Sequence, residues 1–176
     1  MGPVARRRGC KTQLDPARIQ SFGVDECEWL IARGARLNPL PGACYSPLTQ
    51  ASEVYQPEKV RMLLSHGADP NAPTRARFQY DMTQTLRPSE GEMSPLSVAI
   101  GTWYGPREET GAIDECRKVI GDLLQGGADV ARNYRVEIAG DLVSLTALQF
   151  AHLLEEMFPE QGFQRIIDVF RQALAN

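Results

Sequence analysis

The sequence predicts an all-α fold, a solenoid of stacked antiparallel helix pairs joined by hairpin-type loops. Two short phrases recur along the 176 residues in a fixed order, and each phrase has the pattern of a helix. With 43% hydrophobic and 23% charged residues, the composition is that of an ordinary globular domain. Helix pairs that recur in this way bury their apolar faces by stacking on one another, which is why we expect a solenoid.

The first phrase marks the start of one helix in each unit. It reads SPLTQA, SPLSVA and TALQFA at residues 46–51, 94–99 and 146–151. A Ser or Thr hydroxyl accepts a hydrogen bond from an otherwise unpaired amide at the helix start, and proline suits the first helical position. We therefore expect helices to begin at Pro47 and Pro95.

The second phrase marks the end of the other helix. It reads EWLIARGARLN, RMLLSHGADPNA and IGDLLQGGADV at residues 28–38, 61–72 and 120–130. A left-handed residue that closes a helix is usually glycine, because other residues lose about 1–2 kcal/mol in that conformation. Gly34, Gly67 and Gly127 are therefore predicted helix stops, and the 33 residues from Gly34 to Gly67 set the repeat period.

Together the two phrases resemble the ankyrin repeat, in which a T-P-L-H-x-A helix start is followed by a second helix that ends in Leu-Leu-x-x-Gly-Ala-Asp-x-Asn. The resemblance is strongest over residues 46–72 and covers most of residues 12–174. It implies a single domain at residues 12–176 after a basic, flexible tail at residues 1–11. Two clear and two degenerate units are implied, at about residues 12–38, 46–72, 94–130 and 146–174, with the last unit as a C-terminal cap.

Departures from the repeat pattern also carry information. The family's histidine after Pro-Leu, which bonds between adjacent units, is replaced by Thr49, Ser97 and Gln149. We therefore expect a weaker or differently wired network and a stability below that of a consensus array. Residues 73–93 and 103–114 are longer than the connections usual in such repeats, and long connections often carry function.

The residues that could perform chemistry favour structural roles. His66 precedes Gly67, where an imidazole can cap the carbonyls of the last helical turn, and His152 is predicted to lie on a surface or in a groove. The four cysteines contain no C-x-x-C pair and are expected to be reduced thiols. We expect no catalytic site, no cofactor and no metal. The alternative from another class is a small enzyme that uses Cys116 or His152 in a cleft between the inserted loops.

The resemblance implies a non-catalytic protein–protein interaction module that acts as an adaptor, an inhibitor or a regulatory subunit. Its partner would contact the inserted loops and the concave face. Arginine and aromatic residues are typical anchors of protein interfaces. The candidate partner-binding residues in the loops are Arg75, Arg77, Phe78, Tyr80, Trp103 and Tyr104. On the concave face, the register of the family gives Gln50, Glu53, Val98 and Phe150.

The partner that the resemblance implies is a protein of unknown identity, and the charge balance bears on the other classes of partner. A net charge of -3 is too small to favour nucleic acid or membrane, so we expect neither direct nucleic-acid binding nor membrane association. We expect a monomer inside the cell, in the cytoplasm, with the nucleus as the alternative. A nuclear co-regulator or a pathogen effector would use the same scaffold, and its support is the basic run of Arg6, Arg7, Arg8 and Lys11.

The tract at residues 73–93 yields a direct test. We expect the triple variant Arg77→Ala/Phe78→Ala/Tyr80→Ala to stay folded and to lose at least tenfold in affinity for the partner, or about 1.4 kcal/mol. Circular dichroism and titration calorimetry measure the two properties separately. Unfolding of the variant would mean that the tract covers the core, and unchanged affinity would place the interface on the concave face.

Overall fold

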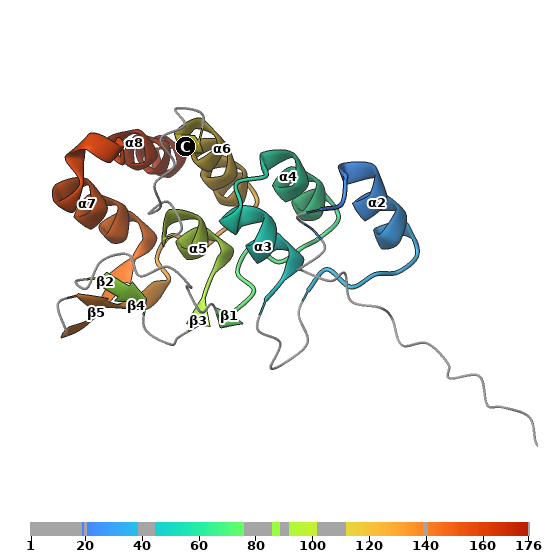
Figure 1. Ribbon diagram of the computed structural model, residues 1–176, viewed down its shortest axis with the longest axis horizontal. Helices are drawn as coiled ribbons and strands as arrows, with labels where there is room; N and C mark the ends of the chain where they lie inside the picture. The colour runs from blue at the N-terminus through green and yellow to red at the C-terminus, as the bar shows by residue number, and fades with distance from the viewer. Residues whose placement is uncertain are drawn as a thin grey trace, which may run out of the picture.

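The computed structural model describes residue 19 and residues 21–38, 45–75, 86–88, 92–101, 112–138 and 141–175. The described chain is mostly helical, as the sequence predicts (Figure 1). Its helices are α2 Val24–Ala32, α3 Pro47–Glu53, α4 Pro57–Ser65, α5 Pro95–Gly101, α6 Ala112–Gln125, α7 Ala147–Met157 and α8 Gln164–Leu174, with a 3-10 turn, η1, at Pro159–Gln161. None of the described helices combines the length and the apolar character that crossing a membrane requires.

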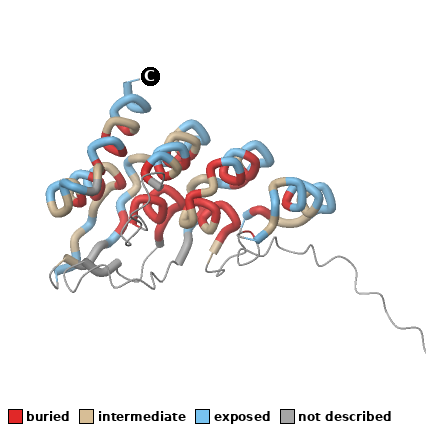
Figure 2. Tube along the Cα trace, turned by 45° about the horizontal axis from the view of Figure 1, so that its top comes forward, coloured by how far each residue is buried: buried red, intermediate tan, exposed pale blue. Residues whose placement is uncertain are grey.

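The helices lie in two rows (Figure 1). In one row α3 contacts α5 and α5 contacts α7; in the other α2 contacts α4, α4 contacts α6 and α6 contacts α8. Consecutive helices also pack across the rows, as α3 does on α4, α5 on α6 and α7 on α8. Figure 2 shows that α3 and α5 are buried along most of their length, whereas the exposed stretches lie mainly on the outward side of the second row.

The helices of the first row begin where the first phrase predicts. The hydroxyl of Ser46 accepts a hydrogen bond of 2.9 Å from the amide of Thr49, at the start of α3. Ser94 accepts the equivalent bond of 3.3 Å from the amide of Ser97, and Thr146 caps α7 in the same way. Each cap satisfies one of the amides that a helix start leaves unpaired, which fixes the first residue of each helix.

The residues at the family's histidine position bond within their own units. The Oγ1 atom of Thr49 lies 2.7 Å from the Oγ of Ser46. The Oε1 atom of Gln149 accepts a 2.8 Å hydrogen bond from the amide of Thr146. These side chains reinforce the helix starts.

The second-row helices α2, α4 and α6 end at the predicted glycines. Gly34, Gly67 and Gly127 have φ angles of 85°, 87° and 89°, in the left-handed region that glycine adopts without strain. After Gly67 the amide of Ala68 reaches back to the carbonyl of Leu63 at 3.0 Å, which satisfies a carbonyl in the last helical turn. The same bond follows the other two glycines.

Asparagine side chains connect each turn to the next. Asn38 donates from Nδ2 to the carbonyl of Gly67 at 3.3 Å, and its Oδ1 accepts from the amide of Asp69 at 2.8 Å. One side chain therefore satisfies two backbone groups in the following helix pair. We call this paired contact an asparagine bridge.

A second asparagine bridge lies 33 residues later in the chain. Asn71 donates to the carbonyl of Gly127 at 2.9 Å and accepts from the amide of Asp129 at 2.7 Å. The corresponding position after α6 holds Ala131, which has no side-chain amide. The series of bridges therefore stops before α7 and α8.

A small sheet also forms, which the sequence analysis did not predict. It contains β2 Leu86–Pro88, β4 Asn133–Ile138 and β5 Asp141–Thr146 in the antiparallel order β2-β4-β5; a separate pair joins β1 Thr74–Arg75 to β3 Glu92–Met93. The predicted loop between α6 and α7 is thus a hairpin of two six-residue strands. Tyr134 of β4 is buried edge-on against Phe150 of α7, with ring centroids 5.5 Å apart, and this contact anchors the hairpin.

The turn between α3 and α4 contains an unusual residue. Tyr55 has a φ angle of 53°, although it is not glycine. Its hydroxyl donates a 3.0 Å hydrogen bond to the carbonyl of Ala99 in α5, and its ring is buried. The bond and the burial offset the conformational cost of about 1–2 kcal/mol for an L-residue. Tyr55 therefore connects one helix pair to the next through the core.

The glycine stops yield a prediction about stability. Gly67→Val should lower the free energy of unfolding by about 1–2 kcal/mol or more, because a β-branched residue resists the left-handed conformation. Gly121→Ala is the matched control, since a Cβ at this helical position would meet only Val169, at 4.0 Å. We expect the control to be neutral or up to about 1 kcal/mol more stable. Urea titration measures the free energy of unfolding of both variants. Equal unfolding midpoints would contradict the role of Gly67 as a left-handed helix stop.

Candidate functional site

The predicted loop residues are only partly covered by the structure. Arg75 lies in β1, whose backbone pairs with β3. The other five predicted loop residues lie outside the described part of the chain: Arg77, Phe78, Tyr80, Trp103 and Tyr104. Their assignment to a partner interface therefore remains a prediction.

Two predicted concave-face residues form a polar cluster on α3. The Nε2 of Gln50 donates to the Oε2 of Glu53 at 2.9 Å, and both side chains are half-buried. Tyr45 adds its hydroxyl to the same carboxylate. Its pKa is raised above the ordinary value by burial and then by the negative charge and hydrogen bond of Glu53. We call these three residues the α3 cluster.

Two other predicted contact residues are buried, which corrects their assignment to a binding surface. Val98 is 0% exposed and Phe150 is 3% exposed. Val98 belongs to α5, in which every residue is buried, and Phe150 packs against Tyr134 of the hairpin. Both side chains therefore stabilise the core and are not available to a partner in this conformation.

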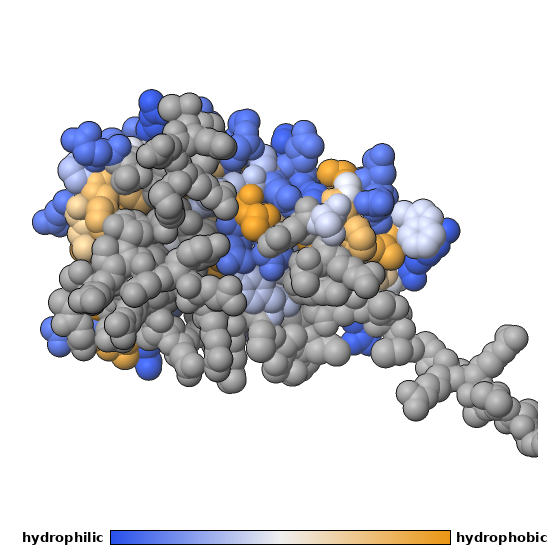
Figure 3. All heavy atoms as spheres, viewed as in Figure 1, coloured by the Kyte–Doolittle hydropathy of each residue, from blue (hydrophilic) through white to orange (hydrophobic). Residues whose placement is uncertain are grey.

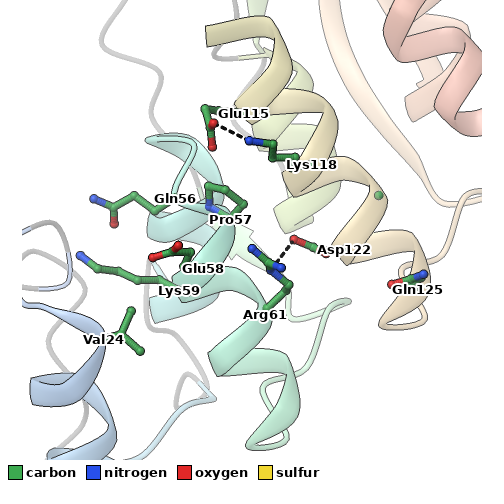
Figure 4. A pocket seen from close by; sticks show the side chains of 11 residues that line it. Val24, Gln56, Pro57, Glu58, Lys59, Arg61, Glu115, Lys118, Asp122 and Gln125 are labelled. Carbon is green, nitrogen blue, oxygen red and sulfur yellow. Dashed lines mark hydrogen bonds and ion pairs between the residues drawn. The ribbon is translucent and has the colours of Figure 1, made fainter. Parts of the chain in front are cut away.

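A polar hollow of about 780 Å³ lies on the outer side of the second row, between α2, α4 and α6 (Figure 4). It is lined by Val24, Gln56, Pro57, Glu58, Lys59, Arg61, Glu115, Lys118, Gly121, Asp122 and Gln125. Figure 3 shows hydrophilic residues gathered along this upper margin of the molecule. We call this region the α4–α6 hollow.

The charges of the α4–α6 hollow are arranged in pairs. Lys118 lies 2.8 Å from Glu115, and the Nε of Arg61 lies 3.4 Å from the Oδ2 of Asp122. Lys59 is mostly buried and donates to the backbone carbonyl of Ile19 at 2.6 Å. The hollow therefore presents both signs of charge in equal number, which suits a polypeptide surface better than a ligand of one charge.

Two acceptor atoms in the hollow are only partly satisfied. The Oδ2 of Asp122 and the Oε1 of Gln56 are buried, and neither accepts a hydrogen bond from the described residues. Burial raises the pKa of Asp122, and the positive charge of Arg61 offsets part of that rise.

The candidate chemical groups lie in three different settings. The Nδ1 of His66 lies 2.9 Å from the carbonyl of Met62, which confirms its predicted contact with the last turn of α4. His152 is exposed on α7, and the Cys116 thiol is buried, with its pKa raised by burial to about 12. Among the described residues, no group of three or more His, Cys, Asp or Glu side chains is placed to hold a metal ion.

One exposed pair was missed by the sequence analysis. Trp29 on α2 is 54% exposed, and the guanidinium of Arg33 lies 3.5 Å from the centroid of its ring. Tryptophan and arginine are the residue types most enriched among interface hot spots. The spacing of four residues on a predicted helix was the available signal, because it places the two side chains next to each other.

Asp122 yields a prediction about pH. A carboxyl group whose pKa is raised by folding holds its proton more tightly in the folded protein, so the stability it contributes is present at low pH and is lost as the pH rises through the raised pKa. Asp122→Asn should therefore melt at a higher temperature than the parent at pH 7. The difference should vanish at about pH 3, below the ordinary aspartate pKa of about 3.9.

The reverse effect is expected from Arg61→Gln, which removes the compensating cation and should lower the melting temperature at pH 7. Thermal melts of the parent, Asp122→Asn and Arg61→Gln at pH 7 and at about pH 3 measure both effects. A melting temperature for Asp122→Asn below that of the parent at pH 7 would show that the ion pair outweighs the burial of the carboxylate.

Comparison with known proteins adds no assignment to these features. No protein-family model matches the chain, and no curated protein matches it significantly.

Proposed function

We propose that this protein is an ankyrin-like repeat scaffold that binds a protein partner without catalysis, as an adaptor, an inhibitor or a regulatory subunit. The asparagine bridges carry the proposal. Asn38 and Asn71 occupy equivalent places 33 residues apart and make the same two bonds to the next helix pair. Such a repeated contact holds successive units in one orientation, as a solenoid requires.

The C-terminal end of the described helical array supports the same proposal. A stacked array needs atypical terminal units, because one side of each faces water. At the C-terminal end, α8 packs Ile166, Ile167 and Phe170 into the core and turns its other face outward, without a Gly-Ala stop. The described C-terminal helix therefore has the character of a capping unit.

Three observations favour binding over catalysis. The Cys116 thiol, whose pKa is about 12, is protonated at neutral pH and is a poor nucleophile. His66 is held by the carbonyl of Met62 and caps a helix. The polar surfaces instead consist of paired charges and exposed anchors, as in the α4–α6 hollow and at Trp29. A small enzyme based on Cys116 is therefore the weaker alternative.

The proposed setting is the interior of the cell, with the protein acting as a monomer in the cytoplasm. Cys27 and Cys116 are both buried free thiols, which suits a reducing compartment. A nuclear co-regulator or pathogen effector remains the alternative, and its support is still the basic run near the start of the chain.

Affinity capture from native cell extract tests the proposal. The parent should retain a partner in stoichiometric amount, and Gln50→Arg should reduce its retention at least tenfold, because a long cation then projects from the α3 cluster. Ala173→Arg is the matched control, since it places the same cation at an exposed position on α8. Point substitutions are preferable to deletion of residues 73–93, because that tract contains β1, β2 and β3.

The outcome separates the alternatives. Equal retention by both variants would move the interface away from α3. Failure of the parent to retain any protein, together with turnover of a small molecule that depends on Cys116 or His152, would support the enzymatic alternative.

A further inference from the structure

Among the strands that the structure describes, the hairpin between α6 and α7 leaves one edge of its sheet unpaired, and we call this the free edge. In the strand order β2-β4-β5, β5 is an outer strand, and it pairs along its whole length with β4 alone among the described strands (Figure 1). An antiparallel strand directs the N–H and C=O groups of alternate residues to its partner and those of the remaining residues to the other side. Every second residue of β5 therefore offers its backbone groups along the free edge.

The composition of β5 does not protect this edge. Natural edge strands commonly carry lysine, proline or a bulge that prevents further pairing. Residues 141–146 read DLVSLT and contain neither lysine nor proline. All six residues are in regular register with β4, from Ile138 opposite Asp141 to Asn133 opposite Thr146. The free edge is therefore regular and can accept another strand.

The side chains of β5 indicate what kind of strand would fit. Leu142 is 57% exposed on one face, and Val143 and Leu145 are half-buried on the other. Asp141 is exposed at the first position, and it is the only charged residue of the strand. Directly opposite residues of neighbouring strands lie about 4.5–5.5 Å apart, so a basic residue opposite Asp141 would add a favourable pair.

We propose that the free edge of β5 binds an extended segment of a protein partner as an additional antiparallel strand. The segment has an apolar residue beside the exposed Leu142 on one face of the sheet. On the other face it has apolar residues beside Val143 and Leu145 and a lysine or arginine opposite Asp141. This inference rests on the proposed function, because it names a second contact surface for the same kind of partner. It differs from that function in using backbone hydrogen bonds instead of helix side chains.

The size of the edge favours such a partner over a second copy of this chain. Six residues of strand span about 20 Å, whereas specific interfaces commonly bury about 1,200–2,000 Å². A symmetric pair of β5 strands would have little else to hold it, and a symmetric register centred on Val143 would place Asp141 opposite the apolar Leu145. A partner that also contacts the helix rows can add this strand to a larger interface.

The experiment uses linear peptides selected from a random phage-displayed library against the folded, full-length protein. We expect selected peptides with alternating apolar residues and a basic residue, and a loss of at least tenfold in affinity for Leu142→Lys. Leu174→Lys is the matched control, because Leu174 is an equally exposed leucine, at 57%, on α8. Asp141→Lys should also weaken binding by reversing the charge opposite the basic residue.

A second readout distinguishes strand pairing from side-chain contact. N-methylation of the selected peptide at alternate residues should abolish binding, and N-methylation at the intervening residues should have little effect, because only every second amide reaches β5. Circular dichroism confirms that both β5 variants remain folded.

Three results would overturn the inference. They are peptides that bind Leu142→Lys as well as the parent, N-methylation effects without alternation, and a parent that elutes as a dimer which Leu142→Lys dissociates. The proposed function would survive each of them if Gln50→Arg still weakens capture of a protein partner. Conversely, if Gln50→Arg does not weaken capture of a protein partner, the proposed function fails, and the binding of the selected peptides to β5 is unaffected.

Discussion

The left-handed turns at Gly67 and Gly127 each leave polar backbone groups that the turn itself does not satisfy, and the preceding helix pair supplies an asparagine that bonds to them. After α4 these groups are the carbonyl of Gly67 and the amide of Asp69, and both bond to Asn38. Unpaired backbone groups are costly once neighbours cover them, so the spacing of the turns and the spacing of the asparagines must agree. This agreement sets the distance between successive helix pairs, and the surfaces on α3 and between α4 and α6 depend on it.

In the core, a side chain of one helix pair likewise bonds to the backbone of the next pair. Tyr55 adopts a conformation that is unfavourable for it, and in return its hydroxyl reaches the carbonyl of Ala99 in the next helix pair. The Cys116 thiol also points to that carbonyl, at 3.7 Å. Helix pairs are thus joined at their turns by asparagine and in their interior by tyrosine. The α4–α6 hollow lies on the outer side of this doubly joined region, which makes it a preorganised surface.

The sequence predicted the elements whose cause is local. Ser46 and Ser94 cap their helices, and Gly34, Gly67 and Gly127 close theirs, because a hydroxyl or a missing side chain acts on the adjacent backbone. Features that depend on contacts between distant segments were missed. The hairpin of β4 and β5 packs on α7 through the contact of Tyr134 with Phe150. The position of Val98 on a predicted helix did not reveal that its side chain would be buried. For the candidate site, the family register named Gln50 and Glu53 as contact residues. The α4–α6 hollow could not be predicted, because it forms only where three helices pack together.

Ala131 has a consequence for how the molecule opens. Because this residue cannot form an asparagine bridge, α7 and α8 are joined to the rest by apolar packing and by the hairpin, including the contacts of α8 with α6 and of α7 with α5. Cooperativity in an array of neighbours is only as strong as the coupling at each boundary. We therefore expect the weakest coupling of the array at the boundary after α6, where β5 also lies, because its last residue is the N-cap of α7.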